Sequence, residues 1–455
     1  MDGYTDQTFK SSSFPTESLS PPGQSVSRFR DECVRIKMKY FNREYAKIFV
    51  AFIGVMLVNM MQNNFWQQIV ENEFGSHHRF LLAFTAGIFS VLSGVLSCIY
   101  PAQNVLGISI FLTSVVYMVN LLCKGWLDQH FFMHLLRNMM FVTALPPFHG
   151  IWASLIQLHK SSVLHVPIVL FSIYQINSDF PIGIISFLGY SYTLGTVSFV
   201  WCAVWVYMIF RPNIVPSYTM INSCTAPTLS DIPWKSMFTS MPVVAILIAV
   251  ICEAFNLAFP YIWTLISSEP ETFFRFSSYR MMNTFIIFVT MIFTIIVLEF
   301  YPKIRSTSTI NIRKFWSCAY FLMQAIFYYV CAFTKETWID DLFFIVYDMV
   351  EVLYAFGFIV NHLDIAPRYA SILCGVITAV YYIFDGCVTN FFIAVKDYLK
   401  DHNDFLVCIL VVIILVNITA VIFYFIFASA EVQPWAKTHD EETQQESDDV
   451  AVLVN

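Results

Sequence analysis

Long apolar segments alternate with short polar ones along almost the whole chain. An α-helix needs about 20 consecutive apolar residues to cross the hydrocarbon core of a bilayer, where it satisfies its own backbone polar groups. Twelve segments meet this requirement, and we predict a membrane-spanning helix for each. They are residues 47–70, 79–100, 105–123, 131–157, 163–188, 191–211, 238–266, 281–301, 314–333, 339–361, 368–394 and 404–428.

The fourth, fifth and seventh of these segments are long and contain proline. A proline inside a helix removes one backbone hydrogen bond and clashes with the preceding turn, so we expect kinks or tilts there. The prolines are Pro146, Pro147, Pro181 and Pro260.

The distribution of basic residues predicts how the chain is oriented. An even number of spans places both termini on one side of the membrane, and Lys and Arg are enriched in cytoplasmic segments. Counting the residues at the span ends with their flanking segments, the N-terminal segment, the even-numbered loops and the C-terminal tail hold 17 of the 25 Lys and Arg residues. We therefore predict that both termini are cytoplasmic.

The spans fall into two sets of six, joined by a polar connection, and this arrangement is typical of a two-halved transporter. We predict an N-terminal half, a C-terminal half, a cytoplasmic linker between them and two cytoplasmic tails, of which the first is partly disordered and the second acidic. Their bounds are 1–46 for the N-terminal tail, 47–211 for the N-terminal half, 212–237 for the linker, 238–428 for the C-terminal half and 429–455 for the C-terminal tail.

Composition indicates that the lipid bilayer is the main partner of the chain. Of the 455 residues, 57% are hydrophobic and 13% are charged, whereas about 25% are charged in a soluble globular protein. The net charge of −7 gives no reason to expect nucleic acid. The 11 cysteines are scattered without a Cys-x-x-Cys pair, so we predict neither a disulfide framework nor a metal site. Phosphate-binding, metalloprotease and triad motifs are absent, and we expect no enzyme and no cofactor.

Four polar motifs interrupt the apolar pattern. They are Pro-Phe-His-Gly-Ile-Trp at 147–152, Pro-Trp-Lys-Ser-Met-Phe-Thr-Ser-Met-Pro-Val at 233–243, Asn-His-Leu-Asp-Ile-Ala-Pro-Arg-Tyr-Ala at 361–370 and Phe-Ala-Ser-Ala-Glu-Val-Gln-Pro-Trp-Ala at 427–436. In order and spacing they resemble the vesicular glutamate transporter and sialin family, which is solute carrier family 17 of the major facilitator superfamily. The resemblance is strong from about residue 231 to 436 and thin over the first 130 residues.

This resemblance implies the major facilitator fold, an all-α membrane protein of about 12 helices in two six-helix halves around one central site. It implies secondary active transport of an organic anion or phosphate by alternating access, driven by an ion gradient such as that of protons or sodium. The membrane would be the plasma membrane or a vesicular or lysosomal membrane.

The chain departs from the family at the cationic positions of the central cavity. In the first span Gln62 replaces the family's arginine, while Asn64 matches. In the fourth span His134 and Phe141 stand at the family's arginine and glutamate positions. In the seventh span Glu253 stands where glutamate-transporting members have an arginine. These replacements leave a neutral or zwitterionic substrate open.

Arg137 can supply a positive charge from a shifted position, because it lies three residues after His134 and can face the same side of the helix. His134 can be cationic in an acidic lumen. Gln62, Asn64, His134, Arg137 and Glu253 are therefore the substrate-path candidates. Two alternatives stay open: Arg137 and Glu253 form a structural ion pair, or either side chain extends to a helix end.

Further acidic residues are candidates for proton coupling. Asp348 and Glu351 are three residues apart in the tenth span, and Asp385 lies in the eleventh. A carboxyl removed from water can take up and release a proton during transport. The alternative for Asp348 and Glu351 is that they line a watery vestibule.

Asp364 and Arg368 are the candidates for a cytoplasmic gate, because they lie four residues apart at the junction of two spans. They can pair with each other or with loop residues of opposite charge, and so latch one conformation. The alternative is a fixed capping interaction without a gating role.

A second function is compatible with the same residues. The lost cations, and a second-to-third loop reduced to Pro-Ala-Gln-Asn at 101–104, also fit a non-transporting membrane interaction or scaffold protein that retains the transporter fold. The polar loops at 233–243 and 361–370 favour the transporter, because they are interface features of a moving carrier.

Overall fold

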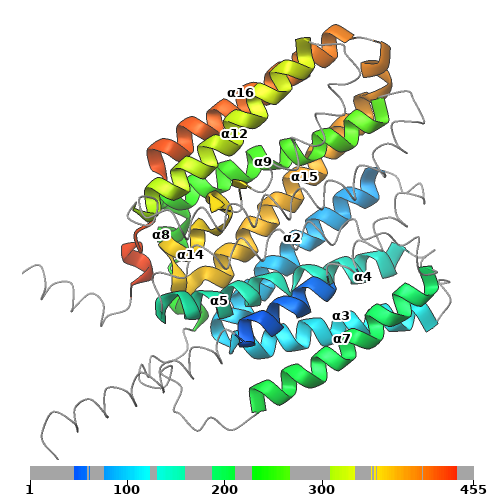
Figure 1. Ribbon diagram of the computed structural model, residues 1–455, viewed down its shortest axis with the longest axis vertical. Helices are drawn as coiled ribbons and strands as arrows, with labels where there is room; N and C mark the ends of the chain where they lie inside the picture. The colour runs from blue at the N-terminus through cyan, green and yellow to red at the C-terminus, as the bar shows by residue number, and fades with distance from the viewer. Residues whose placement is uncertain are drawn as a thin grey trace, which may run out of the picture. The chain divides into compact units, whose positions relative to one another are not determined.

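The computed structural model describes residues 46–58, 61, 76–122, 131–158, 187–210, 228–266, 308–333, 350, 353–354, 356–401 and 403–437. The chain from Ile48 onward forms one compact unit. Within the described residues every regular element is a helix, in agreement with the predicted all-α class (Figure 1).

The helices form an N-terminal and a C-terminal group. The N-terminal group contains a short apolar helix (Ala46–Val58), α2 (Ser76–Ile99), α3 (Ala102–Leu122), α4 (Phe131–Val142), α5 (Leu145–Leu158) and α7 (Phe187–Phe210). The C-terminal group contains α8 (Trp234–Thr239), α9 (Met241–Ile266), α12 (Thr309–Phe333), α14 (Asn361–Ile365), α15 (Ala370–Asp401) and α16 (Asn403–Phe427). Short 3₁₀ turns are η5 (Leu229–Asp231), η6 (Phe358–Val360), η7 (Pro367–Tyr369) and η8 (Pro434–Ala436).

Most predicted spans that fall on described residues coincide with a helix to within a few residues, for example 79–100 with α2 and 191–211 with α7. Among the described residues, five helices are long and apolar enough to cross a membrane. A sixth is added if η5–α8 and the following part of α9, which meet at an angle of 74°, count as one span. The predicted span at 281–301 lies outside the described residues, as do 163–186 of the fifth span, 59–60 and 62–70 of the first, and most of 339–361.

The fourth predicted span is divided into two helices, α4 and α5, with Thr143 and Ala144 between them. Pro147 has no N–H group with which to bond the Thr143 carbonyl one turn earlier. That oxygen instead accepts hydrogen bonds from the hydroxyl groups of Ser93 in α2 (2.6 Å) and Ser109 in α3 (3.2 Å). The expected kink is therefore a complete break, and side chains from two neighbouring helices satisfy the carbonyl that it leaves unbonded.

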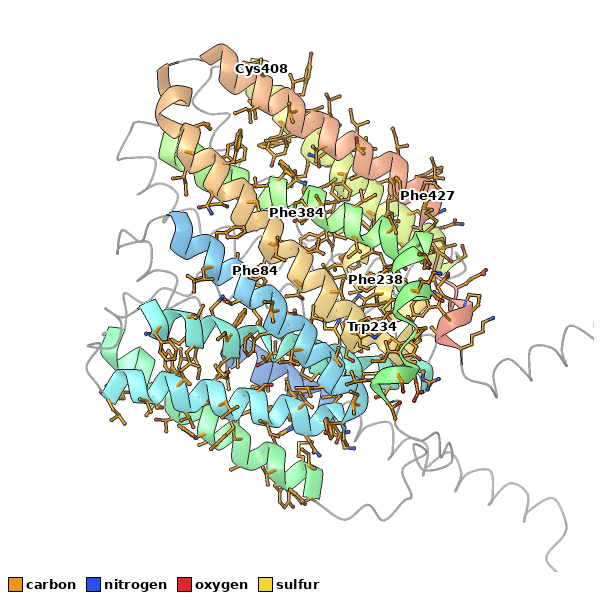
Figure 2. All side chains as sticks on the ribbon, turned by 180° about the vertical axis from the view of Figure 1, so that it is seen from behind. Phe84, Trp234, Phe238, Phe384, Cys408 and Phe427 are labelled. Atoms are coloured by element: carbon orange, nitrogen blue, oxygen red, sulfur yellow. The ribbon has the colours of Figure 1, made fainter. Side chains whose placement is uncertain are left out.

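Large apolar side chains cover the outer faces of the described helices. Figure 2 shows examples at Phe84 on α2 and Phe238 on α8, both more than 40% exposed. In α16 the buried positions recur every three or four residues, at Ile413, Asn417, Ala420 and Tyr424. Apolar residues on the remaining faces are suited to lipid, since a soluble protein rarely exposes such a continuous apolar surface. The chain is an integral membrane protein.

The two groups of helices meet along α2 and α15, which pack side by side through small residues (Figure 1). A side-chain carbon added to Gly375 would lie 2.6 Å from the carbonyl oxygen of Ser90, and one added to Gly386 would lie 2.7 Å from the β-carbon of Ala83. Both distances are too short for real contacts, so the backbones approach closely only because these positions are glycine. Below we call this contact the α2–α15 seam.

Candidate functional site

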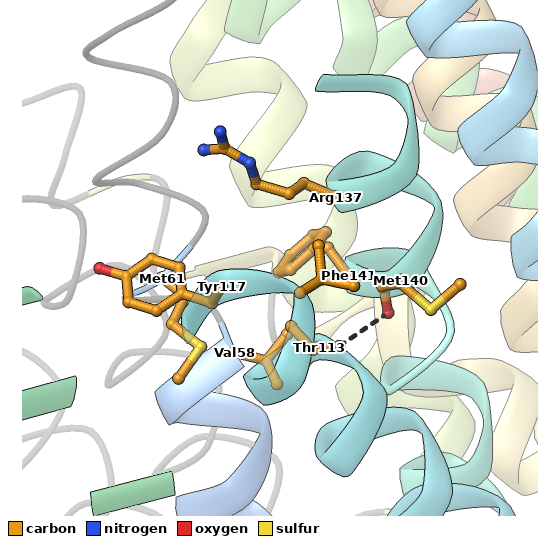
Figure 3. A pocket seen from close by; sticks show the side chains of 8 residues that line it. Val58, Met61, Thr113, Tyr117, Arg137, Met140 and Phe141 are labelled. Atoms are coloured by element: carbon orange, nitrogen blue, oxygen red, sulfur yellow. Dashed lines mark hydrogen bonds between the residues drawn. The ribbon is translucent and has the colours of Figure 1, made fainter. Parts of the chain in front are cut away.

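A pocket lies among the N-terminal helices, between the Ala46–Val58 helix, α3 and α4 (Figure 3). Its cavity volume is about 20 Å³, which is room for one water molecule, so a solute can enter only if the surrounding helices move apart. Its lining residues are Val58, Met61, Thr113, Val116, Tyr117, Arg137, Met140 and Phe141. Most of them are apolar, and Arg137 is the basic residue among them.

Arg137 projects from α4 at the edge of this pocket and is 8% exposed. Tyr117, which lines the pocket from α3, lies close enough to Arg137 for the two side chains to interact electrostatically. The hydroxyl of Thr113 donates to the Met140 carbonyl (3.3 Å) and so fixes α3 against α4 (Figure 3). A guanidinium beside apolar walls can bind a carboxylate or phosphate through two parallel hydrogen bonds.

The other N-terminal substrate-path candidates are less well placed by the structure. Gln62 and Asn64 lie outside the described residues. His134 lies in α4, three residues before Arg137, but its side chain is not among those described. Of these candidates, Arg137 is the one that the described residues bring to the pocket.

Glu253 lies in the C-terminal group, in α9, and is 3% exposed. Its Oε2 accepts a hydrogen bond from the hydroxyl of Tyr320 in α12. Among the described residues, Glu253 does not form the ion pair with Arg137 that the sequence suggested, because its carboxylate faces α12 within its own group of helices. The two buried charges are therefore held separately.

A neutral polar network continues from Glu253 along α9. Asn256 and Asn417 of α16 exchange two amide hydrogen bonds of 3.0 and 2.9 Å, and both residues are fully buried. Asn417 also donates to the Ile413 carbonyl (2.9 Å), and the Tyr328 hydroxyl donates to the Asn256 carbonyl (3.2 Å). Buried amides cost free energy unless they are hydrogen-bonded, so this pair ties α9 to α16.

Sequence reasoning missed this network, although a signal for it exists. Glu253 and Asn256 are three residues apart on α9, so one helix face carries both. Tyr320, Gln324 and Tyr328 are spaced by four residues on α12, and each is at most 1% exposed. Polar residues that recur at helical spacing inside an apolar run indicate a buried polar face.

Of the proton-coupling candidates, Asp348 and Glu351 lie outside the described residues. Asp385 is partly buried in α15, and the Thr389 side chain, one turn further along the same helix, donates a hydrogen bond to it.

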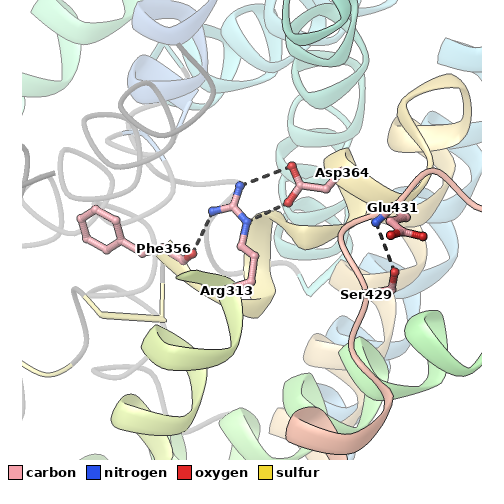
Figure 4. A network of polar contacts seen from close by, with 5 residues as sticks. All are labelled: Arg313, Phe356, Asp364, Ser429 and Glu431. Atoms are coloured by element: carbon pink, nitrogen blue, oxygen red, sulfur yellow. Dashed lines mark hydrogen bonds and ion pairs between the residues drawn. The ribbon is translucent and has the colours of Figure 1, made fainter. Parts of the chain in front are cut away.

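The gate candidate Asp364 lies in α14 and pairs with Arg313 of α12 (Figure 4). The Arg313 Nε atom lies 2.7 Å from Asp364 Oδ2, and Nη2 lies 3.4 Å from Oδ1. The third donor, Nη1, bonds to the carbonyl of Phe356 at 2.8 Å. Because the side chains are only 1% and 7% exposed, this pair is a buried clamp that fixes the loop before α15 against α12.

Arg368, the other gate candidate, has different neighbours from Asp364. Its guanidinium lies over the ring of Tyr369, 5.5 Å from the centroid, and it interacts electrostatically with Asp231 of η5. Asp231 in turn accepts hydrogen bonds from the Thr228 side chain (2.7 Å) and backbone N–H (2.8 Å), which hold the pKa of Asp231 below its ordinary value. The two gate candidates therefore lie in two separate polar contacts.

The sequence of the chain is similar to those of known transporters, although no family model matches it. It is 28% identical to vesicular glutamate transporter 2 of Homo sapiens over 393 residues, which cover 79% of this chain and 65% of that protein. It is 27% identical to vesicular glutamate transporter 3 of Danio rerio over 388 residues, which cover 78% and 64%. The match therefore spans a little less than two thirds of the length of these relatives.

Two solved structures share its arrangement of helices. A mutant of the nucleoside transporter NupG gives a TM-score of 0.53 at 10% identity and covers 85% of this chain and 100% of that one. The human organic anion transporter MFSD10 (TETRAN) gives 0.51 at 11% identity and covers 83% and 99%. These similarities confirm the major facilitator fold, and the relatives confirm the resemblance that the four motifs indicated.

Proposed function

We propose that this integral membrane protein, which has the major facilitator fold and is similar to vesicular glutamate transporters, is a secondary active transporter of a small solute. It moves an organic anion or phosphate by alternating access, in which two halves expose one central site to each side of the membrane in turn. The observation that carries this proposal is the pocket bordered by Arg137, since ionisable residues inside the membrane mark solute pathways more often than packing.

The chemistry of the pocket favours a small anion with an apolar part. The Arg137 guanidinium can hold a carboxylate or phosphate in two parallel hydrogen bonds, while Val58, Val116 and Phe141 offer apolar contact to the rest of the solute. A neutral solute would gain less from the guanidinium, because charge-assisted hydrogen bonds are about twice as strong as neutral ones.

The moving parts in this proposal are the N-terminal half, 47–211, and the C-terminal half, 238–428, joined by the linker 212–237. The α2–α15 seam supports this division, because helices that touch through glycine and small residues can shift against each other with little repacking. The Arg313–Asp364 clamp and Arg368 would form part of a cytoplasmic gate at one end of the seam.

Transport is coupled to a proton or sodium ion in this proposal. Asp385 supports ion coupling, because its carboxyl is partly buried and lies near the contact between the two halves. Asp348 and Glu351 stay candidates for the same role. The protein would work in the plasma membrane or a vesicular or lysosomal membrane, with both termini in the cytoplasm.

The test is uptake by the purified full-length protein in liposomes, measured with an imposed pH gradient and, separately, with an imposed sodium gradient. We expect accumulation of at least one labelled solute from a panel of glutamate, other small carboxylates and phosphate. Arg137→Gln should lower that uptake about tenfold or more, which corresponds to about 1.4 kcal/mol of lost binding. Lys235→Gln removes an exposed charge in α8 and should leave uptake unchanged.

The opposite result is equally informative. If the folded protein accumulates none of these anions and no neutral metabolite, the transporter proposal fails. The non-transporting scaffold would then be the better reading.

A further inference from the structure

Three side chains that can bind a metal ion meet where the N-terminal and C-terminal helices touch. They are His149 at the start of α5, His362 in α14 and Cys374 in the first turns of α15. One ligand atom from each lies within 4.8 Å of the other two. None of these residues belongs to the pocket around Arg137 or to the polar network around Glu253.

The two histidines face each other closely. His149 Nδ1 lies 2.9 Å from His362 Nε2, and the rings stack with centroids 4.9 Å apart and an angle of 22° between their planes. All three residues are buried, with 9%, 1% and 3% of their surface exposed for His149, His362 and Cys374. The facing ring nitrogens and the thiol are therefore held together out of water.

The contact between the two histidines is compatible with the form that a metal needs. One of the two facing nitrogens donates to the other at 2.9 Å, so both rings can be neutral, and the donor nitrogen becomes free to bind a metal when its proton moves to the other nitrogen of the same ring. A neutral imidazole is the form that binds metal ions.

We propose that His149, His362 and Cys374 form a binding site for one Zn²⁺ ion. Zinc prefers nitrogen and thiolate ligands in tetrahedral geometry, at about 2.0 Å to nitrogen and 2.3 Å to sulfur. Two nitrogens bound in this way lie roughly 3.3 Å apart, so the histidine pair needs to open only slightly from its present separation. A water molecule can take the fourth position. The Cys374 thiol loses its proton to solvent when the ion binds.

The site joins two parts of the molecule that lie far apart in the sequence. His149 and His362 are separated by 213 residues, which explains why cysteine and histidine spacing predicts no metal site here. α5 contacts α14, η7 and α15, so the fold alone brings the ligands together.

A consequence follows that rests on the proposed transport function. The ligands come from both proposed halves, so the site is complete only in the conformation in which the halves meet at this junction. Zinc would stabilise that conformation, because an ion that binds one state shifts the equilibrium toward it. Zinc would therefore inhibit turnover.

Cobalt titration of the purified full-length protein tests the metal site without any need for transport. Co²⁺ replaces Zn²⁺ in tetrahedral sites and reports its ligands by absorption. We expect visible bands of tetrahedral cobalt and a near-ultraviolet thiolate band, saturating at one ion per chain and displaced by Zn²⁺. Cys374→Ser should lose the near-ultraviolet band, and His362→Gln should weaken the apparent affinity at least about tenfold.

The matched control is Cys408→Ser, which removes an exposed thiol of α16 and should leave the spectrum unchanged. As a second measurement, Zn²⁺ should raise the melting temperature of the wild type and of Cys408→Ser but not of Cys374→Ser, because only a completed site stabilises the folded chain. Absence of tetrahedral cobalt bands in the wild type, or their survival in Cys374→Ser, would overturn the metal site.

Uptake assays in liposomes then test the consequence separately. Zn²⁺ should inhibit wild-type uptake, and Cys374→Ser should be resistant. Zinc-insensitive uptake with a normal cobalt spectrum would overturn the conformational part of the proposal. A normal cobalt spectrum without any uptake would count against the transport function and leave the metal site supported.

Discussion

Two arginines are buried among the described residues, and their surroundings differ. Arg313 directs its guanidinium at acceptors from the protein itself, namely both carboxylate oxygens of Asp364 and the carbonyl of Phe356. Arg137 borders a pocket whose lining is mostly apolar and which has room for about one water molecule.

The difference shows that burial alone does not reveal what an arginine does. A charge removed from water needs compensation, and the question is which molecule provides it. For Arg313 a loop of the same chain provides a carboxylate, so the residue holds the loop in place. Arg137 interacts electrostatically with Tyr117, and a carboxylate or phosphate from outside the protein could reach it only if the adjoining pocket widens.

The largest effect is expected when the Arg313–Asp364 clamp is removed. Arg313→Ala leaves the Asp364 carboxylate buried without its partner, so we expect a loss of about 3–5 kcal/mol of stability. The loss can be measured as a lower melting temperature of the purified protein. Lys314→Ala is the matched control, since its contact with the Phe425 ring (5.5 Å) contributes only about 0.5–1 kcal/mol. Equal melting temperatures for Arg313→Ala and wild type would mean that the clamp is not structural.

A smaller effect is expected from the neutral network of the C-terminal helices. Asn417→Ala removes both hydrogen bonds to the Asn256 amide and leaves that amide buried, which should cost about 1–3 kcal/mol of stability. Uptake per folded molecule should change little. Thr419→Ala is the control, because Thr419 is exposed and donates to the Leu415 carbonyl of its own helix. Stable Asn417→Ala protein that has lost uptake would place the solute in this network instead.

Arg137→Lys tests the same contrast at the second buried arginine. It keeps the charge but removes the planar pair of donors, so we expect the KM for the transported anion to rise about tenfold while the melting temperature stays close to that of the wild type. Uptake kinetics and melting curves measured on one preparation separate these effects. A large drop in melting temperature with unchanged KM would show that Arg137, like Arg313, is structural.

The smallest effect concerns Asp231, whose carboxyl pKa is lowered by the Thr228 hydrogen bonds. A carboxyl with a lower pKa in the folded than in the unfolded protein adds stability above its unfolded pKa, and this is lost as the pH falls through its folded pKa. Asp231→Asn should therefore lower the melting temperature slightly at neutral pH. It should leave the melting temperature unchanged at pH values below the folded pKa of Asp231. Glu431→Gln, at an exposed carboxyl, is the control. A difference that persists in acid would exclude the charge as its cause.

Much of the fold could be predicted from the sequence, because a long apolar segment in a bilayer has one stable solution, a helix. The 105–123 segment and α3, or 404–428 and α16, differ by at most a few residues at each end. The break in the fourth span was expected as a kink at the prolines. It lies just before them because a proline disturbs the carbonyl one turn earlier, as at Thr143.

The candidate site was less predictable, because the partner of a polar side chain depends on how helices rotate against each other. The sequence allowed Glu253 to reach Arg137, whereas packing turns it toward Tyr320. Likewise Asp364 pairs with Arg313, which is 51 residues away in the sequence. Spacing along one helix predicts a shared face, but it contains no information about the facing helix.

The broken fourth helix has a mechanical consequence. A single oxygen, the Thr143 carbonyl, receives hydroxyl groups from α2 and α3 while it belongs to the turn between α4 and α5. A polar group in an apolar interior has no water with which to bond, so separating these helices would leave a buried polar group without a hydrogen bond. We therefore expect α2, α3 and the α4–α5 pair to move together as one rigid body. A rocking motion of the two halves would then occur at the α2–α15 seam, where glycine lies against the backbone of the facing helix.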